Sequence, residues 1–294
     1  MRGSKPPAFI HVDVDSDQSL GNFYESPHVE TNCVYERGLP RMMNFFSSFD
    51  IPVTFFVCGK DLSIQLNRGL VTQLSRQHHE IANHTFSHVN GFRKLSRTRQ
   101  KEEIMRNTDI IQKVVGVRPI GFRAPGYDVD RGVLDRVTEA GYLYDASSYP
   151  SVLHPLLRWY LLLRRRRAVD PGYGSFWNAY GRTDIHRIGS LWEVPVSVFP
   201  IFRLPLHTNM TMHLPEWYAR FGMFLIGALG QPFVFLFHAV EFVDQADHPD
   251  PHILIHPSFR LSLPQRIRHF EQSVRFLNEH FVLHRTDRYL KARR

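Results

Sequence analysis

Apolar positions along the chain follow two periods, one typical of buried strands and one typical of helices. Short continuous apolar runs predict strands at residues 9–14, 52–57, 80–83, 121–123, 143–145, 191–198, 232–237 and 281–284. Apolar residues at helical spacing predict helices at residues 39–49, 66–76, 97–115, 130–140, 224–229 and 263–281. Strands that alternate with helices along a whole chain indicate a parallel α/β barrel or a doubly wound sheet.

Local residues mark several of the predicted helix ends. Gly116 and Gly141 are expected to end the helices before them, and Asp130 is expected to cap the start of its helix. No linker or internal repeat interrupts the alternation, so we predict one domain over residues 1–294.

Residues 151–190 break this alternation and are expected to form an insertion. Within it, Leu153–Arg167 joins an apolar run and a Trp-Tyr pair to four consecutive arginines. Such a segment is typical of an interfacial helix, with aromatic rings at headgroup depth and arginines on anionic lipid. The same pattern also fits a core helix with a solvated basic end, or a loop that docks on the barrel. Peripheral contact with the inner leaflet through Leu153–Arg167 is therefore one of several open interpretations.

Composition narrows the class of protein. The 294 residues carry a formal net charge of +8 and contain 2 cysteines, Cys33 and Cys58, too few for a disulfide framework. Cys58 lies in a strand-like run and is expected to be a buried free thiol. Residues 1–7 hold basic residues but no apolar segment, and no run of about 18 apolar residues follows. We expect a cytoplasmic protein, with the inner face of the cytoplasmic membrane as a second, peripheral location, and no nucleic-acid partner.

Carboxylates and histidines follow two of the predicted strands. Asp13 and Asp15 stand at the end of the first strand, and His84 and His88 come directly after the third. Barrel enzymes place their chemistry at the carboxyl ends of parallel strands. Two histidines and one carboxylate can hold a divalent metal with an open coordination position, which is a hydrolytic site. One aspartate would complete the metal site and the other would stay free as a base, and the residues alone leave open which is which.

A rival histidine series has the same spacing. His248, His252 and His256 are four residues apart, but Pro249 and Pro251 forbid the helix that would align them. We therefore expect a surface loop there, not a set of metal ligands.

Five motifs follow one another in a specific order: His11–Asp15, His84–His88, Phe122–Tyr127, Trp192–Pro195 and Phe235–His238. With these motifs the chain resembles the polysaccharide deacetylase (NodB-homology) superfamily. Within that superfamily it resembles the branch with Asp-x-Asp in place of adjacent aspartates, which includes a deformylase of undecaprenyl-phosphate-linked 4-deoxy-4-formamido-arabinose. The resemblance covers Phe9 to about Phe242 and implies a distorted (β/α) barrel of the NodB-homology type.

The resemblance also implies a metal site and a base. Asp15, His84 and His88 would be the metal ligands, with Zn²⁺ as the expected metal and Co²⁺ or Mn²⁺ as substitutes. Asp13 would be the general base, and Arg123 would pair with it and hold it ionised.

The remaining roles concern the leaving group and the substrate pocket. His238 would be the general acid that protonates the departing amine. The Tyr127 backbone N–H would stabilise the oxyanion, in a loop that Pro125 makes rigid. Leu236 would line the acyl pocket, and Trp192 would form either a wall of that pocket or part of the core.

The chain departs from the family pattern at two points. Gly126 is interposed before Tyr127, so either residue could supply the oxyanion donor. The family's Asp-x-x-Asp-Trp motif is absent, which leaves Glu193 or Glu241 to tune His238.

Three hypotheses about function follow. The first is a metal-dependent hydrolase that removes an acetyl or formyl group from an amino sugar carried on undecaprenyl phosphate or on a lipid A or envelope precursor. The second keeps this hydrolysis of a non-peptide C–N bond but changes the substrate to a soluble sugar, a capsule or exopolysaccharide precursor, or another amide. The third is a non-catalytic carbohydrate-binding protein, which is disfavoured because none of the predicted catalytic and metal residues is missing.

Overall fold

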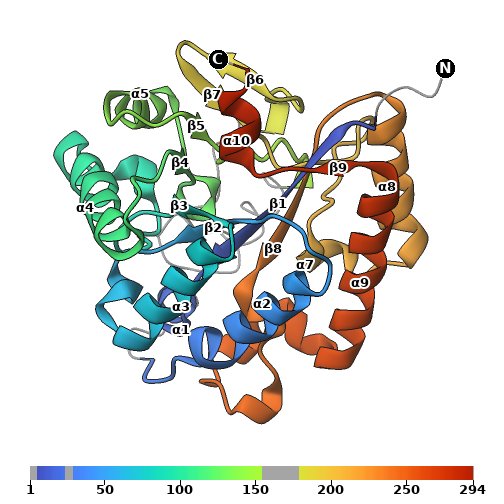
Figure 1. The fold of residues 1–294 in the computed structure, drawn as a ribbon, viewed down its shortest axis with the longest axis horizontal. Helices are drawn as coiled ribbons and strands as arrows, with labels where there is room; N and C mark the ends of the chain where they lie inside the picture. The colour runs from blue at the N-terminus through green and yellow to red at the C-terminus, as the bar shows by residue number, and fades with distance from the viewer. Residues whose placement is uncertain (1–4, 24–28, 154–178, 294) are drawn as a thin grey trace, which may run out of the picture.

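The computed structural model describes residues 5–23, 29–153 and 179–293. The strands of these residues form one sheet in the order β6-β7-β5-β4-β3-β2-β1-β8, with β9 beside β1 (Figure 1). Their bounds are β1 (Pro7–Val14), β2 (Thr54–Val57), β3 (Glu80–Asn83), β4 (Gly121–Phe122), β5 (Tyr144–Asp145), β6 (His186–Ile188), β7 (Leu191–Glu193), β8 (Phe233–His238) and β9 (Val282–Leu283). All of these pairings are parallel except that of β6 with β7.

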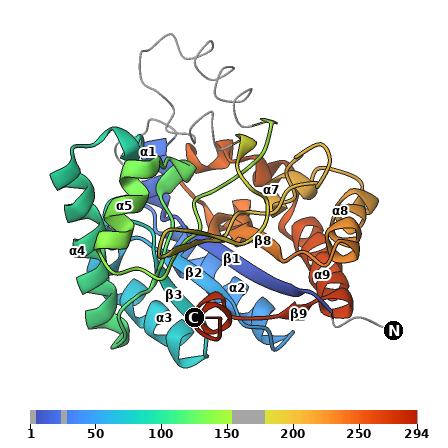
Figure 2. The same cartoon turned by 90° about the horizontal axis from the view of Figure 1, so that it is seen from above.

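Helices surround the curled sheet on its outside (Figure 2). Their bounds are α1 (Asp17–Phe23), α2 (Leu39–Ser47), α3 (Gln65–Arg76), α4 (Arg97–Val115), α5 (Arg131–Glu139), α7 (Thr208–Thr211), α8 (Glu216–Ala228), α9 (Leu263–His280) and α10 (Thr286–Lys291). The structure confirms the predicted distorted (β/α) barrel. The predicted caps are also present: the Asp130 side chain accepts a hydrogen bond of 2.9 Å from the Val133 N–H, and Gly116 ends α4 with φ of 77°.

The prediction of a strand over residues 191–198 is wrong beyond Glu193, where β7 ends. The chain then leaves the sheet, because the Val196 N–H bonds to the Ser148 carbonyl and the Ser197 N–H to the Val234 carbonyl. The short helices α1, α7 and α10 were not predicted, since elements of four to seven residues show too little of the helical period.

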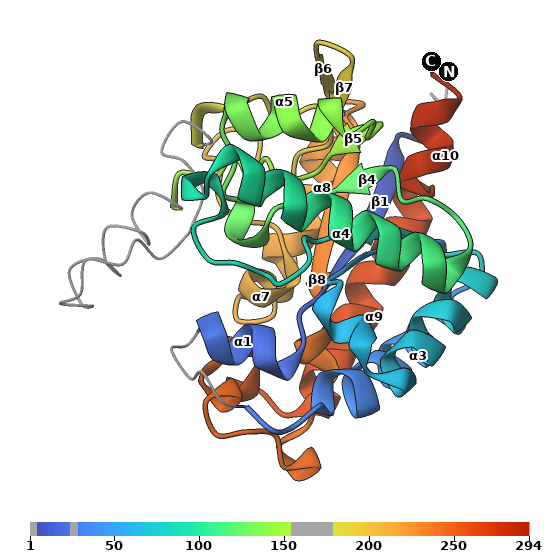
Figure 3. The same cartoon turned by 90° about the vertical axis from the view of Figure 1, so that its left-hand side faces the viewer.

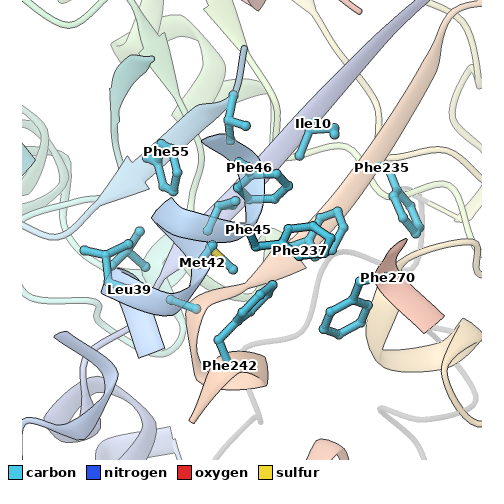
Figure 4. Close-up of a cluster of buried hydrophobic side chains, with 14 of the residues drawn as sticks. Ile10, Leu39, Met42, Phe45, Phe46, Phe55, Phe235, Phe237, Phe242 and Phe270 are labelled. Atoms are coloured by element: carbon cyan, nitrogen blue, oxygen red, sulfur yellow. The ribbon is translucent and has the colours of Figure 1, made fainter. Parts of the chain in front are cut away.

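Aromatic side chains fill the layer between the sheet and the outer helices (Figure 4). Phe46 of α2 meets Phe237 of β8 edge-on at 5.4 Å between ring centroids, and Phe237 meets Phe270 of α9 at 5.3 Å. Such pairs contribute about 0.5–1.5 kcal/mol each beyond the area they bury. This packing fixes β8 between α2 and α9. The parallel register of β8 with β1 places Asp13 directly beside His238.

A second cluster lies inside the barrel, at the end opposite α1. Leu290 of α10 is fully buried there with Phe9 and Val234, and Tyr289 meets Phe9 edge-on at 5.0 Å. Figure 3 shows α10 and α1 at opposite ends of the molecule. Since α1 begins just after Asp15, it marks the carboxyl end of β1 and of the barrel. The opposite, amino end is closed by α10, so the carboxyl end stays available for the site.

Most of Leu153–Arg167, and with it the centre of the predicted insertion at 151–190, lies outside the described residues. The membrane role of that segment therefore stays a prediction. Within the described ranges, no helix combines the length and apolar character needed to cross a bilayer. Cys33 and Cys58 are free and buried, as expected for Cys58.

Candidate functional site

The carboxyl ends of β1, β3, β4 and β8 carry most of the predicted chemistry. In the parallel register, Asp13 lies beside His238 on one side and beside Phe56 on the other. His84 follows β3 directly and Arg123 follows β4. The structure thus brings together six of the predicted residues, in the contacts given below: Asp13, Asp15, His84, His88, Arg123 and His238.

Three of these residues could hold a metal ion. The Asp15 Oδ1 atom lies 3.4 Å from His84 Nε2 and 3.2 Å from His88 Nε2, and all three residues are buried. A tetrahedral zinc ion with bonds of about 2.0–2.2 Å places its ligand atoms about 3.3–3.6 Å apart. Both separations from Asp15 lie within or close to this range, all three ligand atoms lie within 4.8 Å of one another, and the imidazole–carboxylate chemistry suits such an ion.

The two histidines converge through a loop conformation and not through a helix. Thr85 and His88 have φ of 63° and 50°, in the left-handed region that few residues other than glycine adopt. The Thr85 N–H is fixed by the Asn83 side chain at 2.8 Å. His84 Nδ1 lies 2.8 Å from the Arg123 carbonyl oxygen, so Nδ1–H donates there and Nε2 is the atom turned toward Asp15, available to a metal in the neutral ring.

The charge state of Asp15 suits a ligand. Burial opposes ionisation of this carboxyl, but the charges and hydrogen bonds of His88 and His84 lower its pKa well below the usual value. Asp15 is therefore an anion at neutral pH, ready to bind a cation.

Asp13 faces a different cation. Its Oδ1 accepts a 2.6 Å hydrogen bond from Arg123 Nη1. Arg123 is fully buried; it also donates from Nε to the Ala146 carbonyl at 2.8 Å, and its guanidinium lies 4.2 Å from the centroid of the Phe56 ring. These contacts fix the direction from which Asp13 is held.

His238 stands across from the other oxygen of Asp13. Its Nε2 lies 4.0 Å from Asp13 Oδ2, and its Nδ1 lies 3.5 Å from Glu241 Oε1. Burial works against a charged imidazole, but Glu241, and then the Asp13 charge, raise the pKa of His238 to about 9. The Thr208 hydroxyl lies 2.7 and 2.6 Å from the two carboxylate oxygens of Glu241 and holds this side chain in place.

The partner of His238 is thus Glu241 and not Glu193. Glu193 lies on β7 opposite Asp145 of β5. Burial, followed by the charge of Asp145, raises the pKa of Glu193 well above its usual value. Glu193 is therefore engaged with Asp145.

The predicted pocket residues are placed unequally. Tyr127 and Leu236 share a small cluster with Tyr149, and Pro125 opens the turn Pro125–Tyr127. The Tyr127 N–H donates to the Ala124 carbonyl at 3.1 Å, a bond that an oxyanion would have to share or replace. Their roles in binding stay predictions.

Trp192 packs away from these residues. It belongs to the interior cluster that contains Phe9 and Leu290, and Arg187 lies 4.3 Å over its ring. This placement corresponds to the second of the two roles considered for Trp192, part of the core.

The prediction that His248, His252 and His256 form a surface loop is wrong for His256. His252 is exposed, but His256 is buried with its ring centroid 6.2 Å from that of His238. Burial, and then the charge of His238, lower the pKa of His256 to about 3, so it is neutral. The prolines correctly indicated a loop; that the loop folds back onto the site is a tertiary contact with no local signal.

Known proteins share parts of this chain. The family model for polysaccharide deacetylase matches residues 31–144. A peptidoglycan deacetylase of Helicobacter pylori is 26% identical over 114 residues, 38% of this chain and 37% of that protein. A peptidoglycan-N-acetylglucosamine deacetylase of Bacillus cereus is 30% identical over 103 residues, 35% of this chain and 46% of that protein. The matched region thus spans less than half the length of either relative.

Solved structures extend the likeness to the whole chain. A putative polysaccharide deacetylase from Mycobacterium smegmatis has a TM-score of 0.64 and 19% identity, covering 100% of this chain and 93% of that chain. The chain is thus similar in sequence to polysaccharide deacetylases over residues 31–144 and shares their fold over its whole length. An allantoinase structure, with a TM-score of 0.61, 13% identity and 97% and 89% coverage, shows the same fold. Within the superfamily match, residues 31–144 include His84, His88 and Arg123, whereas Asp13, Asp15 and His238 are placed by the structure alone.

Proposed function

We propose that the protein is a metal-dependent hydrolase that removes a small N-acyl group, acetyl or formyl, from an amino sugar. The observation that carries this proposal is the pairing of a metal-type triad with an acid–base pair at one end of the barrel. Asp15, His84 and His88 form the triad, and Asp13 and His238 form the pair.

The division of labour follows from the contacts. Asp15, His84 and His88 would hold the metal, which when bound supplies Lewis-acid polarisation and a water of lowered pKa. Arg123 keeps Asp13 ionised and oriented through the 2.6 Å bond, so Asp13 can accept the proton of the attacking water.

His238 completes the reaction as the acid. Its pKa of about 9 keeps the imidazole protonated at neutral pH. Because Nδ1 faces Glu241, the proton on Nε2 is the one turned toward Asp13 and the reacting group. Transfer of this proton to the amine nitrogen allows the C–N bond to break.

The proposed substrate class is an amino sugar linked to undecaprenyl phosphate or to another envelope lipid. Two relatives are named for peptidoglycan deacetylation, which supports an N-acylated amino sugar. The lipid linkage is supported by the apolar, aromatic and basic composition of Leu153–Arg167, which suits an anionic membrane surface. A cytoplasmic enzyme, peripheral on the inner face of the cytoplasmic membrane, would meet such an intermediate before export.

Mass spectrometry of the products tests the proposal. Zinc-loaded protein is incubated with an N-acylated undecaprenyl-phosphate sugar and, in parallel, with its soluble counterpart. Loss of the acyl group from the lipid-linked form, abolished by Asp13→Asn, supports the full proposal. Cleavage of the soluble sugar alone removes the lipid linkage but keeps the hydrolase, and unchanged cleavage by Asp13→Asn overturns the mechanism.

A further inference from the structure

A buried chain of hydrogen bonds leads away from Asp13 into the barrel. Arg123 Nη2 lies 2.7 Å from His11 Nδ1, and His11 Nε2 lies 2.9 Å from the Thr286 hydroxyl. Thr286 is 3.1 Å from the Thr54 hydroxyl, which donates to Glu80 Oε2 at 2.9 Å. This series of hydrogen bonds therefore connects the site at the carboxyl end with α10, which is labelled in Figure 1, at the amino end.

The Arg123 end fixes the tautomer of His11. A guanidinium has only donors, so the Nδ1 atom that faces Arg123 must be the unprotonated acceptor. Burial, and then the charge of Arg123, lower the pKa of His11 well below its usual value, so the ring is neutral. Its one proton therefore resides on Nε2 and is donated to Thr286.

The Glu80 end demands the same arrangement independently. When Glu80 is ionised its carboxylate can only accept, so the Thr54 hydroxyl gives its proton to Glu80 and must accept from Thr286. Thr286 has then used its own proton and can only accept from His11. Both ends of the chain thus assign the same direction to every bond in it.

We propose that Thr286, acting through His11, is a positioning residue that orients Arg123 and thereby Asp13. Arg123 has three hydrogen-bond acceptors: Asp13, the Ala146 carbonyl and His11. Loss of the His11 acceptor leaves a buried donor unpaired, which is unfavourable, so the guanidinium turns to find another partner. Asp13 then loses its alignment without any change at the triad. This inference rests on the proposed function for the role of Asp13.

Threonine variants separate the hydroxyl from the shape of the side chain. Thr286→Val keeps the branched shape and removes the hydroxyl, whereas Thr286→Ser keeps the hydroxyl. Thr72→Val is the matched control, because the Thr72 hydroxyl donates to the Arg68 and Val114 carbonyls between α3 and α4 and takes no part in the hydrogen-bond series. We expect Thr286→Val to lower kcat about tenfold or more with KM and metal content unchanged, and Thr286→Ser and Thr72→Val to retain the native kcat.

Variants of His11 test the link between Arg123 and Thr286. They also provide a test if Thr286→Val does not fold. His11→Leu removes both hydrogen bonds, whereas the Oδ1 atom in His11→Asn can still accept from Arg123. We expect His11→Asn to retain more kcat than His11→Leu. Equal kcat in these two variants, or a native kcat in folded Thr286→Val, overturns the proposal.

Side-chain nitrogen NMR gives a readout that does not need a substrate. The proposal predicts the neutral Nε2–H tautomer for His11 in the native protein, with signals identified by their loss in His11→Leu. In Thr286→Val, both the His11 and the Arg123 Nη signals should shift. A native Nδ1–H tautomer overturns the inference. If the native protein cleaves no acyl group, the proposed function fails. The spectra still show whether Thr286 orients Arg123 through His11.

Discussion

Asp13 and Asp15 end the same strand two residues apart, yet their surroundings differ completely. Asp13 is supplied with a cation by the protein itself, the buried guanidinium of Arg123. Asp15 faces two imidazole Nε2 atoms at separations that suit ligands of a shared metal ion. The motif allowed either aspartate to take either role. The difference between the two surroundings supports Asp15 as the ligand and Asp13 as the base.

The largest expected effect comes from removing one of the predicted metal ligands around Asp15. His88→Ala should abolish stoichiometric metal binding and lower N-deacylase activity by about 10³-fold or more, since a metal contributes several kcal/mol to the transition state. Elemental analysis and the initial rate of acyl release measure both. His252→Ala is the matched control, because His252 belongs to the rival series at the same spacing but is exposed. Full metal content in His88→Ala would contradict the proposed triad.

Asp13→Asn should separate base catalysis by Asp13 from metal binding by Asp15, His84 and His88. The variant should retain the metal, because Asp13 is not in the triad, while kcat falls by about 10²–10⁴-fold through loss of the base. Metal content and single-turnover acyl release, measured on the same preparation, test this. If Asp13→Asn loses the metal as His88→Ala does, the assigned roles of the two aspartates are wrong.

A smaller effect is expected from replacing Glu241, which helps to raise the pKa of His238, the proposed general acid. His238 must be protonated to act, so activity falls as the pH rises through its pKa, which Glu241 helps to raise to about 9. Glu241→Gln removes this charge, lowers that pKa and moves the basic limb of the kcat–pH profile toward neutral pH. Glu193→Gln is the control and should leave the limb in place, since Glu193 pairs with Asp145. An unmoved limb in Glu241→Gln would exclude Glu241 as the tuning group.

Sequence reasoning succeeded where the physical cause is local. The helix at residues 97–115 is long enough to show its period, and Ser96 and Gly116 cap its two ends. The helix at 263–281 has a capping box at Ser262 and an apolar face of matching length. His84 and Arg123 could be placed near each other because parallel strands deliver their carboxyl ends to one edge.

The parts that sequence reasoning missed depend on contacts between distant residues. Thr286 and His11 are separated by 275 positions, and α10 has six residues, too few to show a helical pattern. The partner of His238 could be narrowed to two glutamates, but only the fold shows that Glu193 is occupied by Asp145. Likewise, the prolines around His252 predicted a loop correctly and said nothing of where that loop packs.

Glu80 is the last residue of the hydrogen-bond series that begins at Asp13 and Arg123. It gives the smallest and most specific test, because the expected effect is on stability and not on activity. Burial, followed by the charge of Asp287, raises the pKa of Glu80 to about 7, well above its value in an unfolded chain. The folded state then binds this proton more tightly, so the stability that Glu80 contributes is present below about pH 4.5 and is lost as the pH rises to about 7. Glu80→Gln keeps an acceptor for Thr54 and removes the titration. Urea unfolding from pH 4.5 to 7.5 should show that the native protein loses up to about 2–3 kcal/mol more than Glu80→Gln over this range. Parallel curves for the two proteins would mean that Glu80 has an ordinary pKa. The Glu80 carboxyl would then be ionised at neutral pH.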